Sequence, residues 1–467
     1  VVLAASCGVE LNRVIHYKPL LDAAIDTAKH KPQHCMIFQR PESLAKLDQP
    51  HDLDWAVQVS EAISVDCVPV KATDPLYILY TSGTTGTPKG ILRDNGGHAV
   101  AMKYSMEAIY GMKQGDVFWA ASDVGWVVGH SYIVYAPLIH GCTTVLYEGK
   151  PIGTPDAGAF WRVVSEYNVK ALFAAPTAFR AIKKQDSDAE LAKKYNLDCL
   201  QTIFVAGERL DPPTYHWLNE TFQRPIIDHW WQTETGWAIA ANMVGIERLP
   251  TKPGSSCVPT PGFNIEIIDD EGNVLPTGAQ GNIAVKLPLP PSCLPGIWQD
   301  FSRFKQVYLD PIPGYYLSGD GGYFDEDGYL FIMGRIDDVI NIAGHRLSTG
   351  RMEEVVAAHS AVAECAVVGI NDDLKGQLPV GFVILKDGVA ISEDQLREEV
   401  VALVRGEIGA IACFHQMHVV SRLPKTRSGK VLRKVIRQIA HSEVFVVPST
   451  IDDPASLDEF YTLLAPA

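Results

Sequence analysis

The sequence predicts an α/β fold, part of which is antiparallel or barrel-like. Short apolar runs alternate with helical patterns, and those at residues 170–175, 202–206 and 225–228 each end where a distinctive motif begins. This arrangement is typical of α/β sheets, whose ligands sit at the carboxyl ends of the strands. The segments 270–273 and 325–328 have the composition of hairpin turns between alternating strands, which indicates the antiparallel part.

Two further elements are expected nearer the ends of the chain. Residues 1–7 have the pattern of the end of a buried strand. Residues 392–395, Ser-Glu-Asp-Gln, resemble a capping box that opens a helix. The apolar positions of this helix fall on one face: Leu396, Val400, Leu403 and Val404.

Composition narrows the class of protein. With 467 residues, 47% of them hydrophobic and 20% charged, the chain is long enough for two or more domains with substantial cores. Its formal net charge of −15 argues against nucleic acid or an anionic membrane as a partner. The sequence has no run of about eighteen apolar residues, so no membrane span is predicted. Nine scattered cysteines without a C-x-x-C pair suggest neither a zinc site nor a disulfide framework, so a reducing compartment is expected.

The most informative stretch is residues 80–90, Tyr-Thr-Ser-Gly-Thr-Thr-Gly-Thr-Pro-Lys-Gly, which follows an apolar run at 76–80 that predicts a buried strand. Such a loop is suited to phosphate, because unshielded backbone N–H groups, hydroxyls and a lysine converge on the anion. A Walker A loop is excluded, since Pro88 stands where that motif needs its second glycine. The alternative is an ordinary surface turn, in which the same residue types are common.

Four later segments complete a series that resembles the adenylate-forming superfamily: acyl-CoA synthetases, luciferases and peptide-synthetase adenylation domains. In order they are an aromatic-x-Thr-Glu segment at 230–236, a ribose-binding segment at 316–320, a hinge at 334–338 and a catalytic-lysine loop at 424–430. Within the superfamily, the segments 125–132 and 147–151 and the pair Trp230-Trp231 resemble the short-chain branch of acetyl- and propionyl-CoA synthetases, with propionyl-CoA synthetase (propionate–CoA ligase) the nearest.

The resemblance implies the adenylate-forming enzyme fold, in which a large N-terminal domain of α/β sheets and a barrel-like part precedes a small mobile α+β domain. The hinge motif then sets a large AMP-binding domain at 1–336, a small domain with the catalytic lysine at 337–440 and a tail at 441–467. Relatives carry a long segment before this chain begins, and residue 1 is not Met, so a truncated start is expected.

The chemistry implied by the resemblance has two steps at one site. A carboxylate is a poor electrophile, so ATP first attaches AMP to it with loss of pyrophosphate; the thiolate of coenzyme A (CoA) then attacks the acyl carbon and releases AMP. Two anions meet in the first step, so positioning and charge neutralisation should supply most of the acceleration. Lys430 is the expected catalytic residue, with a solvated basic tail as its alternative, and Glu234 is the expected Mg²⁺ ligand, directly or through water.

The resemblance also assigns the remaining contacts. Thr233 is expected at the α-phosphate, and Asp320 at the ribose hydroxyls with Arg335 helping; for Asp320 a Gly-Asp turn is the alternative. Asp337 is the expected hinge, with an exposed turn residue as its alternative. The residues expected to bind ATP or AMP are Thr81, Ser82, Gly83, Thr84, Thr85, Gly86, Lys89, Gly207, Glu208, Trp230, Gln232, Thr233, Asp320, Arg335 and Arg346. Those expected at CoA are Ala343, Gly344 and Arg405, and His359 is a candidate ligand of a structural cation. Arg209 departs from the family pattern, because relatives often have proline there.

Three positions bear on the size of the acid. Trp231 resembles the tryptophan that closes the acyl pocket in short-chain members and leaves room for about two or three carbons. Ala206 stands where acetate-preferring relatives tend to have valine, and the extra space is worth roughly 1–3 kcal/mol in discrimination. Val127 and Val128 fit an apolar acyl wall or, alternatively, an ordinary core. Propionate is therefore favoured over acetate.

Other functions stay open at this point. Acetate–CoA ligase is the nearest alternative, a related enzyme that passes its acyl group to a carrier protein is another, and a non-catalytic nucleotide-binding fragment belongs to a different class. Lys430 is also a candidate for acetylation, which would remove its charge and make a lysine acetyltransferase or deacetylase a partner. A cytoplasmic location is expected, or the mitochondrial matrix if a transit peptide precedes the chain.

Overall fold

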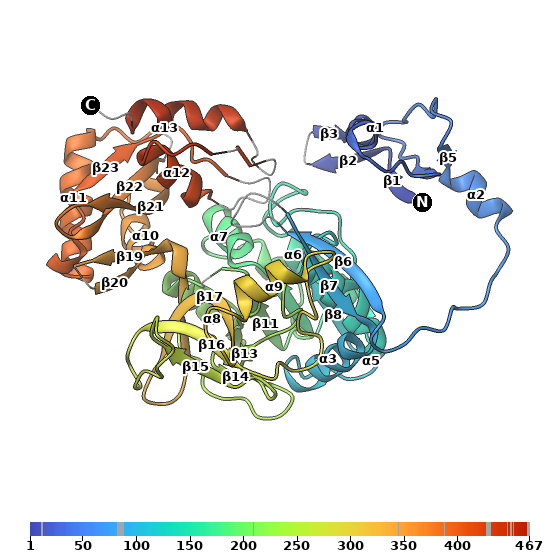
Figure 1. Ribbon diagram of the computed structural model, residues 1–467, viewed down its shortest axis with the longest axis horizontal. Helices are drawn as coiled ribbons and strands as arrows, with labels where there is room; N and C mark the ends of the chain where they lie inside the picture. Colours follow the sequence, from blue (N-terminus) through green and yellow to red (C-terminus); the bar gives the residue numbers. More distant parts are fainter. Residues whose placement is uncertain are drawn as a thin grey trace. The chain divides into compact units, whose positions relative to one another are not determined.

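The computed structural model describes residues 1–464 except 11–12, 82–87, 209, 344, 387, 426–430, 446, 449–450 and 452. The chain divides into two compact units (Figure 1). Unit 1 comprises residues 1–70 and 148–159, and unit 2 comprises residues 71–147 and 160–467. The hinge boundary predicted at residue 337 lies inside unit 2 and stays a prediction.

Unit 1 is built on a small parallel sheet in the order β1-β4-β5 (Val2–Ala5, Cys35–Phe38 and Asp52–Asp54). Its other elements are the hairpin of β2 (Cys7–Glu10) and β3 (Arg13–His16), and helices α1 (Tyr17–Thr27) and α2 (Trp55–Glu61). Ile25 of α1 packs with Cys35 and Ile37 to form the core. The strand expected in residues 1–7 is present, but Leu3 is 59% exposed, so the expectation of a buried strand is wrong there.

The first half of unit 2 holds a five-stranded parallel sheet. Its order is β12-β11-β10-β8-β9: Ile226–Asp228, Thr202–Val205, Ala171–Ala174, Val117–Ala120 and Thr143–Thr144. The expected strands at 170–175, 202–206 and 225–228 are thereby confirmed. Every residue of β10 and β11 is buried, as expected for central strands of a sheet covered on both faces.

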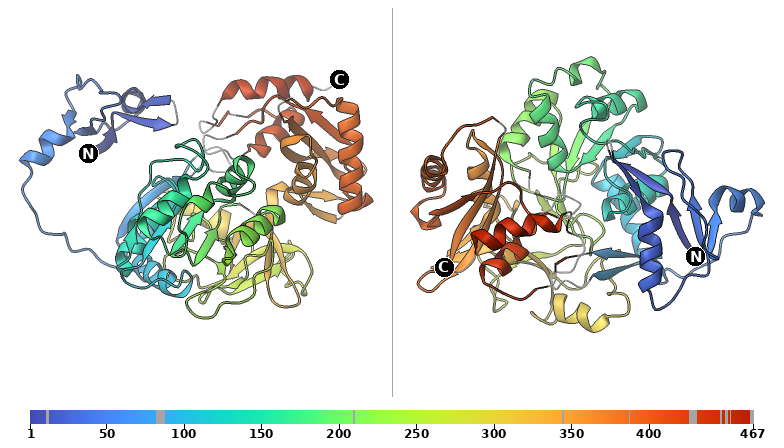
Figure 2. Two further views of the ribbon diagram at one scale, coloured as in Figure 1. Left: turned by 180° about the vertical axis from the view of Figure 1, so that it is seen from behind. Right: turned by 90° about the horizontal axis from the view of Figure 1, so that it is seen from above.

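Helices cover both faces of this sheet (Figure 2). Phe118, Phe173 and Phe204 join the core that includes α3, whereas Trp119, one residue on from Phe118, packs edge-to-face on Phe160 of α6. This alternation follows from the two-residue period of a strand. The helices are α3 (Asn95–Ala108), α4 (Val127–Gly129), a π-helix (His130–Tyr135), α5 (Ala136–His140), α6 (Ala159–Tyr167), α7 (Pro176–Gln185) and α8 (Pro212–Phe222).

The strand before the predicted phosphate loop is not part of that sheet. Strands β6 (Pro75–Thr81) and β7 (Lys89–Asp94) form a separate antiparallel hairpin, and the connecting residues 82–87 lie outside the described residues. Tyr80 is 64% exposed, so the expectation that 76–80 is a buried strand is wrong for this residue. The buried strand is β7, in which Ile91 and Arg93 are fully buried, because a two-stranded hairpin can bury one strand and leave its partner half-solvated.

A four-stranded antiparallel sheet confirms the predicted antiparallel part. Its order is β15-β16-β17-β18: Ile265–Ile268, Gly281–Lys286, Tyr315–Phe324 and Leu330–Arg335. The turn predicted at 325–328 joins β17 to β18. The turn at 270–273 is also present, since Asp269 accepts hydrogen bonds from Glu271 N and Asn273 N, but β16 begins only at Gly281. Helix α9 (Phe301–Tyr308) precedes β17, and β13 (Ala240–Ala241) pairs with β14 (Val258–Pro259).

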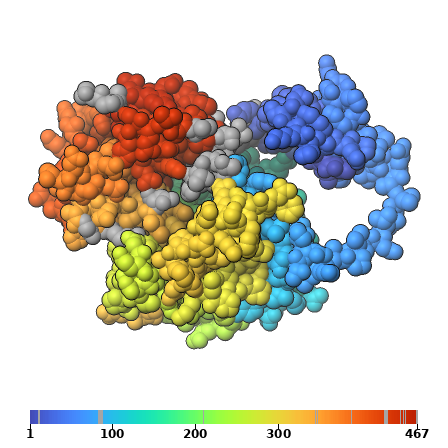
Figure 3. Space-filling view, viewed as in Figure 1, coloured from blue at the N-terminus to red at the C-terminus, as the bar shows by residue number. Residues whose placement is uncertain are grey.

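The chain ends in the small α+β part that was predicted, coloured orange to red in Figure 3. Its sheet has the order β20-β19-β22-β21, with β23 parallel to β22. The strands are β19 (Val339–Ile342), β20 (His345–Ser348), β21 (Val362–Asp372), β22 (Gly376–Leu385) and β23 (Gln416–Val419). One core cluster holds residues of α10 (Thr349–Ala357) and α11 (Glu393–Glu407), and another holds residues of α12 (Arg433–Ala440) and α13 (Asp458–Leu463).

The helix expected after residue 392 is α11, and its N-cap is Ser392, whose Oγ accepts a hydrogen bond from Gln395 N at 3.2 Å. Leu396, Val400 and Val404 are buried, whereas Leu403 is 37% exposed and lies outside the buried stripe. In the part of the chain that the structure describes, no helix has the length and hydropathy needed to cross a membrane.

Candidate active site

The segment 229–236 leaves β12 at the carboxyl edge of the parallel sheet and carries five of the predicted site residues. One of them, Gln232, joins this motif to the predicted ribose-binding motif: its Nε2 donates to Asp320 Oδ2 at 2.5 Å and to Ser318 O at 2.7 Å. Trp230 Nε1 donates to the same carboxylate oxygen at 3.3 Å. Tyr316 OH donates to Gln232 Oε1 at 3.0 Å. Two motifs more than eighty residues apart thus form one network.

Asp320 and Arg335 face each other across β17 and β18 as register partners. Arg335 Nη1 donates to Ser318 O at 2.9 Å and lies 3.5 Å from Asp320 Oδ1. Burial raises the pKa of the Asp320 carboxyl, although Arg335 and Gln232 act in the opposite direction. Gly319 has φ +73°, and a Cβ there would lie 2.4 Å from the Arg335 guanidinium, so the close approach requires glycine. A carboxylate held in this way can accept hydrogen bonds from a sugar diol.

Glu234 lies beside Lys89, the lysine at the end of the predicted phosphate loop. Lys89 Nζ donates to Glu234 Oε1 at 3.0 Å, and both side chains are only 14% exposed. Burial opposes ionisation of Glu234, but the Lys89 ammonium and the Tyr308 hydroxyl outweigh it, and the pKa of the carboxyl is lowered. An ionised carboxylate next to the predicted phosphate loop fits Mg²⁺, a hard cation that shares oxygen ligands with substrate phosphates.

Arg93 is a functional residue that sequence reasoning missed. Its side chain is fully buried and donates to the carbonyl oxygens of Thr233, Glu234, Thr235 and Ser292. A Cβ on Gly236, which has φ +77°, would lie 2.7 Å from the Arg93 guanidinium carbon. Arg93 therefore fixes the backbone turn that carries the predicted phosphate and Mg²⁺ ligands. The available signal was a charged residue at an inward position of a strand, two residues from the buried Ile91.

The four residues predicted to line the acyl pocket include Trp231, which lies among aromatic side chains. Its ring meets that of Tyr132 edge-to-face, with centroids 5.4 Å apart, and stacks at an angle of 26° with the ring of His229, with centroids 6.4 Å apart. Ala206 and Tyr132 belong to one hydrophobic core cluster. Trp231 and Val128 are partly buried and pack against that cluster. Val127, the fourth predicted residue, is half-buried in α4.

His229 supports Trp231 from the sheet side. Its Nδ1 contacts Val205 O at 2.7 Å, and Tyr110 OH lies 2.9 Å from Nε2. A neutral ring satisfies both contacts if Nδ1–H donates to the carbonyl and Nε2 accepts from the phenol. Burial lowers the pKa of His229 to about 4, so the ring behind Trp231 is uncharged at neutral pH.

Several predicted residues lie outside the described residues: Ser82, Gly83, Thr84, Thr85, Gly86, Gly344 and Lys430. The base of the Lys430 loop is described, and Lys425 bridges to Val431 across it. Arg433, just beyond the loop, donates to both oxygens of Glu353 at 2.9 and 2.7 Å. The alternative of a solvated basic tail is therefore wrong at Arg433.

The remaining predicted residues are placed as follows. Asp337 lies in the 3₁₀ turn Ile336–Asp338 and Arg346 in β20, and their side chains are not described. Ala343, with φ +48°, lies in the turn between β19 and β20, and Arg405 is exposed near the end of α11. Thr81 Oγ1 is buried and has no hydrogen-bond partner among the described residues.

Two transfers from the family have competing explanations in the structure. Glu208 accepts from Thr177 N and pairs with Arg180, both at 2.7 Å, while the neighbouring Gly207 has φ +96° and open space around its α-carbon. His359 lies 2.7 Å from Glu399 through Nε2, and its Nδ1 accepts from Ala361 N. Both nitrogens of this imidazole are engaged by the protein, which argues against His359 as a cation ligand.

Comparison with known proteins assigns the family. The model of the AMP-binding enzyme family matches residues 9–298, and that of the AMP-binding enzyme C-terminal domain matches residues 351–430. The chain belongs to the AMP-binding enzyme family. It is 51% identical to the mitochondrial acyl-CoA synthetase short-chain family member 3 of Mus musculus, covering 97% of this chain and 67% of that protein. It is 44% identical to the propionate–CoA ligase of Escherichia coli, covering 98% and 74%.

A solved structure agrees on the fold. The acetoacetyl-CoA synthetase from Streptomyces lividans superposes with a TM-score of 0.87 over 99% of this chain and 70% of that one, at 22% identity. The predicted resemblance to short-chain acyl-CoA synthetases and the predicted adenylate-forming fold are confirmed.

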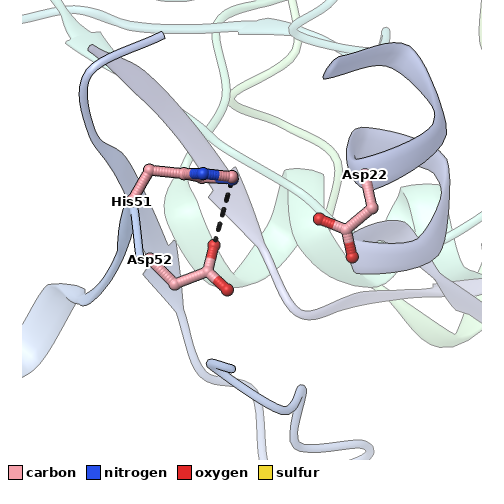
Figure 4. A group of neighbouring side chains, drawn as sticks. All are labelled: Asp22, His51 and Asp52. Atoms are coloured by element: carbon pink, nitrogen blue, oxygen red, sulfur yellow. Dashed lines mark ion pairs between the residues drawn. The ribbon is translucent and has the colours of Figure 1, made fainter. Parts of the chain in front are cut away.

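One further group of titratable side chains lies in unit 1. Asp22, His51 and Asp52 have potential ligand atoms within 4.8 Å of one another, and the His51 ring faces the Asp52 carboxylate at 3.8 Å (Figure 4). Lys18 already lies between the carboxylates, with Nζ 2.6 Å from Asp22 and 2.9 Å from Asp52. Because this ammonium supplies the balancing charge, the group is an ion-pair cluster of the unit 1 core.

The Arg93→Met variant tests the buried clamp. Four carbonyl groups lose a charged donor, so we expect the free energy of unfolding to fall by about 3–5 kcal/mol in urea titrations. Arg162→Met is the matched control, because Arg162 makes an exposed pair with Glu166 one helical turn away, and its loss should cost about 0.5 kcal/mol or less. An equal, small effect of both substitutions would contradict the role of Arg93.

The His229→Gln variant tests the neutral imidazole. The pKa of His229 is 6.5 in the unfolded chain and about 4 in the folded chain. As pH falls through that window, protons bind to the unfolded chain first, and the free energy of unfolding decreases. Between pH 7 and pH 5 the parent should lose about 2 kcal/mol more stability than the variant in urea titrations. Parallel pH profiles of the two proteins would show that His229 is not held neutral.

Proposed function

We propose that this protein catalyses the ATP-dependent ligation of a short-chain carboxylate, preferably propionate, to coenzyme A. An acyl-adenylate is the intermediate, and AMP and pyrophosphate are released. The main support for this proposal is that segment 230–236 contacts two other motifs. Gln232 binds Asp320 of the ribose-binding motif, and Glu234 binds Lys89 of the predicted phosphate loop. The similarity to propionate–CoA ligase and to short-chain acyl-CoA synthetases supports the substrate class.

In the proposed mechanism, Asp320 and Arg335 orient the ribose, and Thr233 and Lys89 orient the phosphates. Mg²⁺, when bound at Glu234, neutralises phosphate charge. Lys430 brings a positive charge to the carboxylate and the α-phosphate, and the apolar surroundings of Trp231 exclude water from the acyl carbon. Trp230, Gln232, Gly207 and Glu208 complete the nucleotide site, and Arg346 contributes a second phosphate contact.

The second step requires a different arrangement of the same groups. We propose domains at 1–336 and 337–440 that rotate about Asp337, after which Ala343, Gly344 and Arg405 contact CoA. Acetylation of Lys430 would block the first step by removing its charge. We further propose a location in the cytoplasm or in the mitochondrial matrix; the mouse relative is named as mitochondrial.

The deciding experiment measures acid-dependent pyrophosphate release with ATP, Mg²⁺ and CoA. Acetate, propionate, butyrate and hexanoate are compared, on this chain and on a version extended by the relatives' preceding segment. A maximum at propionate supports the proposal, and a maximum at acetate favours acetate–CoA ligase. ATP binding without release in either version would favour the non-catalytic alternative.

The Trp231→Gly variant tests the acyl pocket. Removing the indole should raise kcat/KM for hexanoate at least tenfold and lower it for propionate, because each methylene contributes roughly 1–3 kcal/mol to discrimination. Trp231→Phe is the control, since it keeps an aromatic floor and should shift the preference less. A Gly variant that still prefers propionate and gains nothing on hexanoate would contradict the assignment.

The Lys430→Ala variant tests the catalytic lysine. We expect it to abolish propionyl-AMP formation, measured as pyrophosphate release, but to retain thioester formation from supplied propionyl-AMP and CoA. Lys434→Ala on α12 serves as the control and should retain both steps. Equal loss of both half-reactions would mean that Lys430 is not specific to adenylation.

A further inference from the structure

Tyr308 contacts the proposed Mg²⁺ ligand and belongs to none of the five motifs. It is the last residue of α9, whose N-cap is Asp300, which accepts a hydrogen bond from Arg303 N at 3.1 Å. Phe304 and Tyr308 lie one turn apart on the same face, and each is only 5% exposed. The short helix thus directs one phenol inward, toward the Glu234 side chain.

The ring of Tyr308 is held by stacking. It lies parallel to the ring of Tyr316, with centroids 5.3 Å apart and an angle of 8° between the planes. Tyr316 is fully buried and donates through its own hydroxyl to Gln232. The orientation of Tyr308 is therefore tied to the residues that hold the Asp320 carboxylate.

The hydroxyl of Tyr308 completes a triangle of polar atoms. It donates to Glu234 Oε1 at 2.6 Å and lies 2.5 Å from Lys89 Nζ, which itself donates to Glu234 Oε1 at 3.0 Å. Both donors to the carboxylate act on the same oxygen, Oε1. Neither of these two hydrogen bonds engages the second carboxylate oxygen.

Besides its hydrogen bond to Glu234, Lys89 has a predicted role in phosphate binding, which Tyr308 lacks. It follows directly on the predicted phosphate loop, so bound nucleotide attracts its ammonium. A neutral phenol is not attracted by phosphate in this way and remains as the partner that keeps Glu234 in place.

From this geometry we infer that Tyr308 is a positioning residue, whose hydroxyl orients the Glu234 carboxylate for Mg²⁺. The inference rests on the proposed function, because the role of Glu234 as the Mg²⁺ ligand is part of that proposal.

Calorimetric titration with ATP, in the presence and absence of Mg²⁺, tests the inference without acid or CoA. The measured quantity is the factor by which Mg²⁺ tightens ATP binding. In Tyr308→Phe this factor should fall about tenfold, the size of one hydrogen bond to a charged acceptor, while binding of metal-free ATP stays at the parent value. The Mg²⁺ concentration for half-maximal pyrophosphate release should rise by a similar factor, with an unchanged KM for propionate.

Tyr315→Phe is the matched control. It removes a hydroxyl that donates to a glutamate, Glu266, from a residue that directly precedes the ribose-binding segment 316–320. It should leave the Mg²⁺ factor unchanged. In a Glu234→Gln background, Tyr308→Phe should cause no further loss, because the phenol acts through that carboxylate.

The outcomes separate the inference from the proposed function. A parent protein with a normal Mg²⁺ factor and a Tyr308→Phe variant that keeps all of it would overturn the role of Tyr308 alone. An additive loss in the Glu234→Gln background would overturn it equally. A parent whose ATP binding does not respond to Mg²⁺ would overturn both this inference and the assignment of Glu234.

Discussion

The site depends on the buried guanidinium of Arg93. A charge without solvent is costly unless hydrogen bonds surround it, and here four backbone carbonyls do so. Three of them belong to the turn that carries Thr233 and Glu234, so the cost of burying the charge is met by the turn itself. Lys89 lies on the same strand as Arg93 and holds the side chain of Glu234 while Arg93 holds its backbone. Strand β7 thereby aligns the predicted phosphate loop with the turn that carries Thr233 and Glu234.

Local charge explains how a chain of net charge −15 can attract anionic substrates. Lys89 and Arg335 stand among the nucleotide motifs, each close to one carboxylate, Glu234 or Asp320. Each carboxylate is also tied to uncharged donors, a phenol in one case and an amide in the other. The neutral hydrogen bonds fix the geometry of each charge pair in surroundings of low dielectric. Without these hydrogen bonds, solvent would separate the two charges.

Sequence reasoning succeeded where function needs a fixed local pattern. The Ser392 cap, the turn at 325–328 and the three parallel strands are encoded within a few residues of sequence. It missed Tyr308 and Arg93, because their partners lie 74 to 219 residues away and only the fold brings them together. An inward-facing charge in β7 and an aromatic face on α9 were the available signals. The exposure of Tyr80 was missed because an apolar run does not reveal how many strands will flank it.

The contact between Lys89 and Glu234 has a thermodynamic consequence. The nucleotide-free protein carries its own counter-ion in the site, so no bare carboxylate has to be stabilised before ligand arrives. Under the proposed role of Glu234 as a Mg²⁺ ligand, binding of a metal–nucleotide complex would exchange one cation for another at this carboxylate, and the affinity would reflect a difference between two ion pairs. In that proposal the Lys89 ammonium would return to Glu234 when the product leaves, and the pair would keep the charge of the site balanced in each turnover.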